Sequence, residues 1–259
     1  MNIEKINKYL PMLKKFIDLN KSLSHKIEKK LPQYQYRIFG GFNDSVITTI
    51  EGLNKGDVIL DIGGGRRSPF AKHIKKDVEV IGIDISDEEL KLNPHLSRFV
   101  VCDVTVNLPF EDNSVDLIMS RSVVEHLNGV PDFVKEAHRV LKPNGKFIHL
   151  FPSKFAPFAI ANRMLPNAIA KKILYKIHPH QVGLGGFKAY YEHCYYPAFP
   201  NLLEKENFNI HLAKAGFYQS NYFTFFLPFY LISALYEMIL YYLDLKILGA
   251  NLLVVASKK

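Results

Sequence analysis

Short apolar runs alternate with helical patterns through the middle of the chain. Each run is rich in Val, Ile and Leu and is bounded by turn residues, which is typical of a buried strand. The runs lie at 57–62, 78–84, 98–103, 114–120 and 146–151. Between the last two, residues 131–141 repeat apolar side chains at the spacing of a helix. This alternation predicts an α/β fold with a doubly wound, mainly parallel sheet and helices on both faces.

Weaker patterns predict the remaining elements. A capped helix is expected over 43–53, ending near Gly52, and Ser68 is expected to cap a helix that runs to about Lys75. Residues 86–89 have the form of a capping box. The later part of the chain predicts a helix that ends at 213–216, a strand-like run at 217–226 and a last strand at 251–257.

Two segments outside this alternation are amphipathic or strongly apolar. Residues 3–27 have apolar side chains at helical spacing and lysines on the other face, and Pro11 is expected to start or kink a helix there. Residues 228–248 are also helix-like, with a narrow polar stripe formed by Ser233, Glu237, Tyr241 and Asp244. Both helices either bury their apolar faces within the protein or a dimer, or lie on a membrane surface.

The predicted organisation is a basic helical extension over 1–42 followed by one domain over 43–259. That domain carries an insertion at about 152–198, after the fifth strand, and an apolar helical insertion at about 228–248. Hydrophobic residues make up 48% of the chain, which suits a sizeable globular core. The formal net charge is +8, and eight lysines against three acidic residues place +5 of it in 1–31.

The cysteines and the apolar stretches indicate a cytoplasmic setting. Cys102 and Cys194 are far apart and match no metal-ligand spacing, so they are expected to stay reduced. The first residues lack the continuous apolar core of a signal peptide. No stretch reaches the roughly 18 uncharged apolar residues of a membrane span. Contact with a membrane is therefore expected to be peripheral, through 1–27 and 228–248.

Three consecutive predicted strands end in a carboxylate. Asp61, Asp84 and Asp103 occupy these positions, and Asp61 is followed by the glycines of 63–65. In a doubly wound sheet, ligands bind outside the carboxyl ends of the strands, and glycine lets the backbone approach a ligand closely. A dinucleotide site fits this set poorly, because Ser68 stands at the third small position and Asp103 would have no role.

The ordered set resembles the class I S-adenosylmethionine-dependent methyltransferases, in particular the type 11 group. The resemblance extends over 57–151 and includes "SVDLIMSRSVVEHL" (114–127) and "RVLKPNGKFI" (139–148). It implies a Rossmann-like sheet of seven strands, the last antiparallel, and S-adenosylmethionine as cofactor. It also implies that the glycine turn and Asp61 hold the methionine portion, Asp84 the ribose hydroxyls and Asp103 the adenine amine.

The residues expected to contact the cofactor are therefore strand-end acids, glycines and their neighbours. They are Asp61, Gly63, Gly64, Gly65, Arg67, Asp84, Ile85, Asp103, Val104 and Ser120. The sequence departs from the family at Arg67, which occupies the place of the third glycine, with Arg66 before it. These cations either point into solvent, or one of them pairs with the cofactor carboxylate or an acidic acceptor.

The acceptor side is expected to use histidines and tyrosines. Candidate bases are His126, which follows the fourth strand, and His180 and His193 of the insertion. His178, Tyr190 and Tyr191 are expected to bind the acceptor, although a packed aromatic lid explains the same residues. No metal is expected, because no carboxylate cluster accompanies the His-x-His sequence.

The predicted function is methyl transfer to a small-molecule, glycan or lipid-linked acceptor, with a hydroxyl favoured. A non-catalytic methyltransferase-like protein that binds cofactor or a partner is the alternative. Nucleic-acid methylation is disfavoured, because most of the excess charge belongs to the N-terminal segment and no pattern for base stacking is present.

Overall fold

The computed structural model describes residues 3–32, 37–66, 68–164 and 188–259. The chain forms two compact units. The sheet unit consists of Ile38–Ala215 and Ile247–Lys259, and the helical unit consists of Met1–Arg37 and Gly216–Lys246. The N-terminal segment that the sequence sets apart thus joins the apolar segment near residue 230 in one unit.

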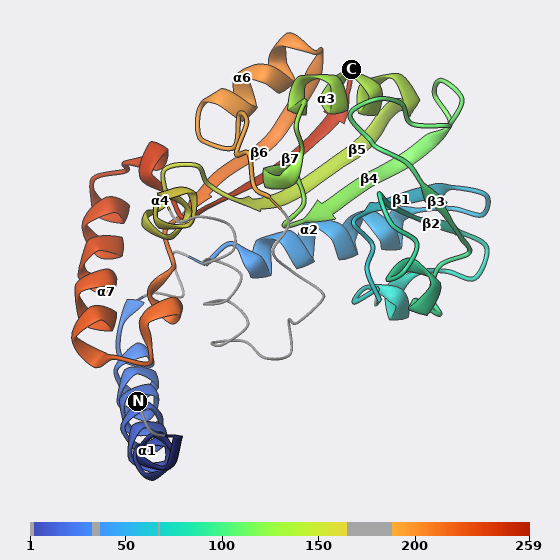
Figure 1. Ribbon diagram of the computed structural model, residues 1–259. Helices are drawn as coiled ribbons and strands as arrows, with labels where there is room; N and C mark the ends of the chain where they lie inside the picture. Colours follow the sequence, from blue (N-terminus) through green and yellow to red (C-terminus); the bar gives the residue numbers. More distant parts are fainter. Residues whose placement is uncertain (1–2, 33–36, 67, 165–187) are drawn as a thin grey trace. The chain divides into compact units, whose positions relative to one another are not determined.

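The sheet unit is built on seven strands (Figure 1). The strands are β1 (Val58–Ile62), β2 (Glu79–Asp84), β3 (Arg98–Val101), β4 (Val115–Arg121), β5 (Leu141–Pro152), β6 (Phe208–Gly216) and β7 (Asn251–Lys258). Their order is β3-β2-β1-β4-β5-β7-β6. Strands β1 to β5 pair in parallel, and β7 runs antiparallel to β5. The predicted α/β class, the mainly parallel seven-stranded sheet and the antiparallel last strand are confirmed.

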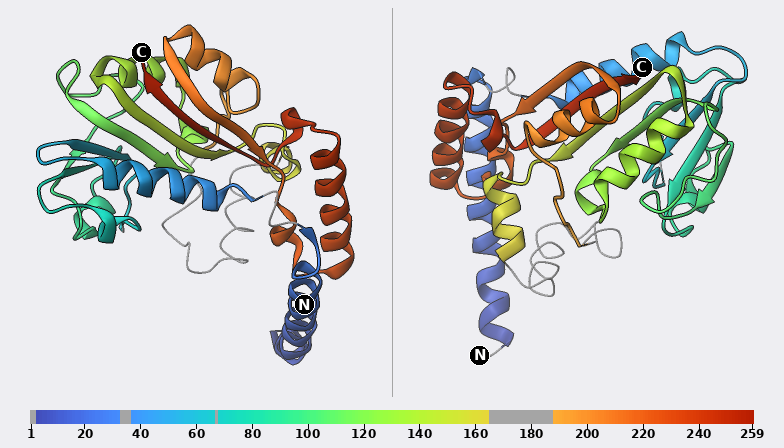
Figure 2. Two further views of the ribbon diagram at one scale, coloured as in Figure 1. Left: turned by 180° about the vertical axis from the view of Figure 1, so that it is seen from behind. Right: turned by 90° about the horizontal axis from the view of Figure 1, so that it is seen from above.

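Each face of the sheet has its own apolar core, because neighbouring residues of a buried strand point to opposite faces. Ile59 packs in the core under α2 (Phe39–Gly52). Leu60 packs in the core under α3 (Val130–Val140) and α6 (Ala198–Lys205). Figures 1 and 2 show α2 on one face of the sheet and α3 with α6 on the other. Helices on both faces were predicted from the sequence.

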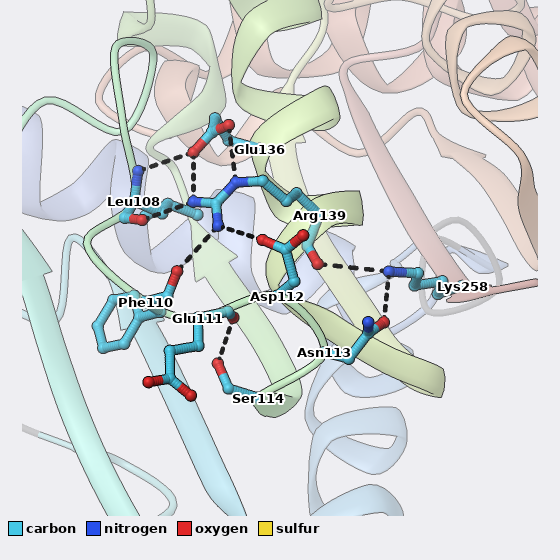
Figure 3. Close-up of polar contacts among 9 residues, drawn as sticks. All are labelled: Leu108, Phe110, Glu111, Asp112, Asn113, Ser114, Glu136, Arg139 and Lys258. Atoms are coloured by element: carbon cyan, nitrogen blue, oxygen red, sulfur yellow. Dashed lines mark hydrogen bonds and ion pairs between the residues drawn. The ribbon is translucent and has the colours of Figure 1, made fainter.

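A network around Arg139 fixes the end of the sheet where β4 begins (Figure 3). The guanidinium donates to both carboxylate oxygens of Glu136, at 3.1 and 2.8 Å. It also donates to the carbonyl oxygens of Phe110 and Leu108 and to Asp112, at 2.8–2.9 Å. These charge-assisted bonds hold the loop before β4 against α3. The segment around Arg139 therefore contributes structure.

Several local predictions were wrong in the first half of the sheet unit. No α-helix follows Ser68, and residues Ala71–His73 form only the 3₁₀ turn η2. The buried Ser68 hydroxyl has no partner among the described residues, so it caps nothing. So short a segment supplies too few hydrogen bonds to sustain an α-helix. Helix α2 begins at Phe39 without a side-chain cap, because burial of Phe42 extends the apolar face of the helix backwards.

The second half also differs from the prediction. The helix expected to end at 213–216 is the strand β6, in which Phe208, Ile210 and Leu212 recur at the two-residue period of a strand. The strand-like run 217–226 contains the 3₁₀ helix η6 (Ser220–Phe223). The capping-box sequence at 86–89 precedes another 3₁₀ turn, η3 (Leu90–Leu92).

The helical unit contains α1 (Ile3–Glu28), which continues through Pro11, and α7 (Leu227–Tyr242). Asn20 of α1 accepts a hydrogen bond from the backbone N–H of Leu227 at 2.9 Å. The Ser24 hydroxyl donates to the carbonyl oxygen of Thr224 at 3.3 Å, and the rings of Phe16 and Phe226 lie 6.4 Å apart. Across the described residues, no helix combines the length and apolar character needed to span a membrane.

The remaining described elements are short. They are η4 (Val124–His126), α4 (Pro157–Met164) and η7 (Lys246–Leu248). The predicted insertion after β5 begins with α4, and residues 165–187 of it lie outside the described residues.

Candidate active site

The turn after β1 is shaped by its glycines. Gly63 and Gly65 have φ angles of +69° and +48°, a region that side chains disfavour. A Cβ on Gly63 would lie 2.4 Å from Cγ2 of Val123, and one on Gly64 would lie 3.2 Å from the carbonyl oxygen of Asp61. The three glycines therefore let the turn fold tightly between Asp61 and the segment that follows β4.

Asn93 also holds this turn, a role that was not predicted from the sequence. Its buried side-chain amide donates to the carbonyl oxygens of Gly64 and Gly65, at 3.2 and 3.1 Å. Its carbonyl oxygen accepts the backbone N–H of His95 at 3.1 Å. The glycine turn is thus fixed by a side chain 28 or 29 positions later in the chain.

A pocket opens beside the turn at the carboxyl ends of β1 and β4. It encloses about 420 Å³, including space open to solvent. Its lining residues are Phe42, Asp61, Gly63, Gly64, Pro69, Phe70, Met119, Ser120 and Arg121. Burial raises the pKa of Asp61 to about 7, and the positive charge of Arg121 opposes that rise. The pocket therefore contains a carboxyl group that changes charge near neutral pH.

Asp84 and Asp103 follow the next two strands but do not line this pocket. Asp84 is half-buried, accepts the N–H of Ser86 at 3.3 Å, and has a pKa raised by burial. Ile85 after it is exposed. One oxygen of Asp103 accepts both the N–H and the hydroxyl of Thr105, at 2.9 and 2.7 Å. The structure thus places the three acids at the ends of adjacent strands, in the order β3-β2-β1.

Two other predicted cofactor residues have different surroundings. Val104 is buried and belongs to the apolar core. Ser120 lines the pocket, and its buried hydroxyl lies 2.6 Å from Nδ1 of His149. Burial lowers the pKa of His149 to about 3, so the ring is neutral. His149 sits in a predicted strand, and its sequence position gave no sign that it would reach Ser120.

Arg66, the first arginine after the glycines, is paired with Glu89. Arg66 donates two hydrogen bonds to Glu89, from Nε at 2.6 Å and from Nη2 at 2.9 Å. The pair is partly exposed, so solvent screens it and it contributes little to stability. Arg66 therefore neither points freely into solvent nor is available for the cofactor carboxylate in this arrangement. Arg67 lies outside the described residues.

The candidate base His126 meets the insertion. Nδ1 of His126 lies 3.0 Å from the carbonyl oxygen of Lys188, and burial lowers the pKa of the ring. The preceding residue, Glu125, is buried, and burial raises its pKa to about 8. Its Oε1 lies 3.7 Å from Nε2 of His126, and its Oε2 has no partner among the described residues. A neutral histidine and a carboxyl group with a raised pKa thus lie side by side after β4.

The described end of the insertion is fastened to this segment by the backbone. The N–H groups of Tyr190 and Tyr191 both donate to the carbonyl oxygen of Glu125, at 2.8 and 3.0 Å. Glu192 accepts the N–H groups of Gly129 and Val130, at 2.8 and 3.0 Å, where α3 begins. Neither Glu125 nor Glu192 was predicted from the sequence, where only histidines and tyrosines were considered for the acceptor side.

The predicted acceptor residues are only partly brought together. Tyr190 is partly exposed, with Nζ of Lys188 4.5 Å from its ring centre, whereas Tyr191 is buried in the core. His193 lies next to Glu192, with Nδ1 3.9 Å from a carboxylate oxygen. His178 and His180 lie outside the described residues. Within the described ranges, no cluster of side chains has the composition of a metal site.

Comparisons with known proteins place this site in a family. Residues 60–149 match the family model described as "Methyltransferase domain". "Arginine-hydroxylase NDUFAF5, mitochondrial" of Danio rerio is 36% identical over 34% of this chain and 29% of its own length. "Sarcosine/dimethylglycine N-methyltransferase" of Aphanothece halophytica is 27% identical over 51% of this chain and 48% of its own. The chain thus spans less than half the length of these curated relatives.

The fold itself has solved relatives. Geranyl diphosphate C-methyltransferase from Streptomyces coelicolor A3(2), in complex with Mg²⁺, geranyl diphosphate and S-adenosyl-L-homocysteine, aligns with a TM-score of 0.52. The alignment covers 85% of this chain and 79% of that one at 13% identity, so it concerns the fold alone. The expected cofactor, S-adenosylmethionine, is the one this family uses. The segment 60–149 is therefore a methyltransferase domain with the class I fold, as the sequence resemblance predicted.

Proposed function

We propose that this protein is an S-adenosylmethionine-dependent methyltransferase that acts on a small-molecule, glycan or lipid-linked acceptor, with a hydroxyl as the methylated group. The observation that carries the proposal is the row of Asp61, Asp84 and Asp103 at the carboxyl ends of three adjacent strands. The row lies beside a glycine turn and a pocket, where open α/β sheets bind their ligands.

The charges and hydrogen-bonding groups of this row suit S-adenosylmethionine. Asp84 can accept hydrogen bonds from the ribose diol, and the oxygen of Asp103 that Thr105 does not use can accept from the adenine amine. Asp61 can hold the methionine ammonium, whose positive charge favours the ionised carboxylate over the protonated form. When bound, the cofactor supplies an electrophilic methyl group on a sulfonium.

On the acceptor side, His126 is suited to take a proton from a hydroxyl. Its lowered pKa keeps the ring neutral at pH 7. A hydrogen bond donated by Nδ1 to the carbonyl oxygen of Lys188 puts the ring's lone pair on Nε2. Tyr190, on the segment fastened beside His126, is a candidate contact for the acceptor.

Calorimetric titration with S-adenosylhomocysteine tests the cofactor site. Asp84→Ala should weaken binding about 30- to 900-fold, through the loss of two hydrogen bonds to a charged group, while NAD should release no heat with either protein. Asp87→Ala is the matched control, because this partly exposed carboxylate follows the same strand and pairs with Lys91. Equal affinity of the Asp84 variant and the parent would remove the assignment.

Incubation with methyl-labelled S-adenosylmethionine and a fractionated lysate tests the acceptor class. Label in the lipid, glycan or small-molecule fraction is expected, and His126→Gln should reduce transfer by about 100-fold or more while cofactor affinity stays unchanged. Label found only in protein or nucleic acid would refute the acceptor proposal and leave the cofactor proposal standing. Tight cofactor binding with no transfer to any fraction would favour the non-catalytic alternative.

A further inference from the structure

The outward face of α7 consists of apolar side chains. At about 100° per residue, Leu231, Ile232, Leu235, Ile239, Tyr242 and Leu243 fall within an arc of about 120°. All six are exposed, among them Ile232 at 66% and Leu235 at 59%. This arc contains no charged residue. A soluble surface helix normally presents its polar side to water, so α7 has the reverse arrangement.

Ser233 and Glu237, from the polar stripe of α7, lie on the buried side of the helix together with Tyr230 and Leu240. Glu237 is fully buried and accepts the backbone N–H groups of Gln219, at 2.7 Å, and of Ser220. The Ser220 hydroxyl lies 3.3 Å from its other oxygen, and Ser233 is buried on the same side. The polar stripe is therefore occupied within the helical unit, and the apolar face is what the unit presents outward.

Helix α1 repeats this arrangement. Its buried residues include Asn20, which accepts the backbone N–H of Leu227 at the start of α7, and Ser24, which donates to Thr224 just before it. Its exposed apolar residues Met12, Phe16, Leu19 and Leu23 fall within an arc of about 60°. Two helices of one unit thus combine buried polar groups on one side with exposed large apolar side chains on the other.

The charge of the helical unit indicates what covers these faces. Residues 1–37 contain nine Lys or Arg against three Asp or Glu. Over residues 11–28 of α1 the lysines are exposed, and Lys15 and Lys26 lie at neighbouring helical positions along one edge of the apolar stripe. Exposed apolar side chains bordered by lysines match the two layers of an anionic lipid surface, hydrocarbon below and phosphate above.

We propose that the helical unit docks on an anionic lipid surface, with α1 and α7 lying in the interface. With 16 residues, α7 is about 24 Å long, which is shorter than the roughly 30 Å hydrocarbon core of a bilayer. The helix therefore lies along the surface, as its continuous apolar arc requires. Docking does not depend on the proposed methyl transfer, because none of these residues belongs to the cofactor or acceptor site.

Co-sedimentation of the full chain with vesicles tests the proposal. The parent should bind vesicles of phosphatidylglycerol mixed with phosphatidylcholine, and should bind much less to phosphatidylcholine alone. The double variant Ile232→Glu with Leu235→Glu should reduce binding at least about tenfold. Its matched control is Val106→Glu with Leu212→Glu, which adds the same charge at exposed apolar positions of the sheet unit and should bind like the parent.

A second variant separates charge from apolar contact. Lys15→Gln with Lys26→Gln should weaken binding to the phosphatidylglycerol vesicles at about 0.15 M salt and leave the remaining binding less sensitive to salt. Melting curves confirm that each variant is folded before its binding is compared.

Three results would overturn the proposal. The parent could stay in the supernatant with phosphatidylglycerol vesicles at low salt. The Ile232 and Leu235 double variant could bind as well as the parent does. Light scattering could show a dimer in solution that this double variant converts to monomers, in which case a second copy of the chain covers the face of α7.

Discussion

The sheet unit and the helical unit differ in the side chains that they expose. Both bury apolar residues, which in the helical unit include Tyr230 and Leu240. In the sheet unit, apolar residues such as Leu60 and Phe147 fill the interior, and carboxylates collect at the ends of the strands. In the helical unit, Ser24 and Glu237 are buried while Ile232 is exposed. Removing apolar groups from water stabilises a fold, whereas burying polar groups is costly unless they are hydrogen-bonded. The exposed apolar face of the helical unit is the difference on which the proposed docking to a lipid surface rests.

A buried glutamate in each unit sharpens this difference. In the helical unit, Glu237 accepts hydrogen bonds from the backbone N–H groups of Gln219 and Ser220. In the sheet unit, Glu125 has one carboxylate oxygen without a partner among the described residues. A buried carboxyl group without partners keeps its proton, which suits a residue next to a candidate base better than a purely structural role.

The largest predicted effect is the pH dependence that Glu125 gives to the free energy of unfolding. The folded pKa is raised from 4.5 to about 8, so the unfolded chain loses this proton first. Stability therefore falls as pH rises from about 4.5 to about 8, by up to about 5 kcal/mol at about 1.4 kcal/mol per pKa unit. Urea titrations over this range should show that Glu125→Gln lacks this part of the slope. Parallel pH profiles for variant and parent would contradict the prediction.

The apolar core of the sheet unit should respond next most strongly. Phe147 is fully buried, with ring centres 5.8 Å from Phe133 and 5.1 Å from Phe208. Phe147→Ala should lower the free energy of unfolding by about 3–5 kcal/mol, through lost burial and the cavity left behind. Phe147→Leu, which keeps most of the volume, should cost clearly less in the same denaturation experiment. Equal losses would mean that the site collapses around the smaller side chain.

In the helical unit, the sensitive position should be polar. Glu237→Ala leaves the N–H groups of Gln219 and Ser220 buried without partners, and should cost about 1.5–3 kcal/mol. Thermal melts and far-UV circular dichroism measure the loss. Asp18→Ala, at an exposed acidic residue of α1 in the same unit, is the control and should change little. If both variants melt like the parent, the polar interior of this unit contributes nothing to its stability.

A smaller effect is predicted at Asn93, which holds the glycine turn through its amide. Asn93→Ala should cost about 1–2 kcal/mol of stability and weaken S-adenosylhomocysteine binding several-fold, because the carbonyl groups of Gly64 and Gly65 lose a donor. Calorimetry beside the exposed control Asn107→Ala measures both effects. Unchanged cofactor affinity would show that the turn keeps its shape without this side chain.

The smallest effect should come from the outward face of α7. Ile232→Ser should change stability in water by less than about 0.5 kcal/mol, because the side chain is already exposed and the two residues have similar helix propensity. The same change should reduce binding to phosphatidylglycerol vesicles. A large loss of stability in denaturant would place this residue inside a packed interface and weaken the comparison between the two units.

The sequence alone determined the sheet and the residues at its ends. Short buried strands are recognisable because their apolar runs and bounding turns are local, and the acids Asp61, Asp84 and Asp103 follow from where those runs stop. The glycine turn was also predicted, since only glycine readily adopts the φ of +69° found at Gly63. The class I methyltransferase fold over 60–149 rests on these features.

The tertiary structure decided everything that depends on distant partners. Asn93 reaches the glycine turn, His149 reaches Ser120, and Glu192 reaches the start of α3 only after the chain has folded. The spacing of residues in the sequence identified the polar stripe of α7, but it did not determine whether that stripe faces the interior of the protein or the solvent. The side of α7 that carries Glu237 faces inward, where its carboxylate accepts hydrogen bonds from the backbone N–H groups of Gln219 and Ser220. Leaving those N–H groups buried without a partner would cost more free energy than leaving an isoleucine exposed.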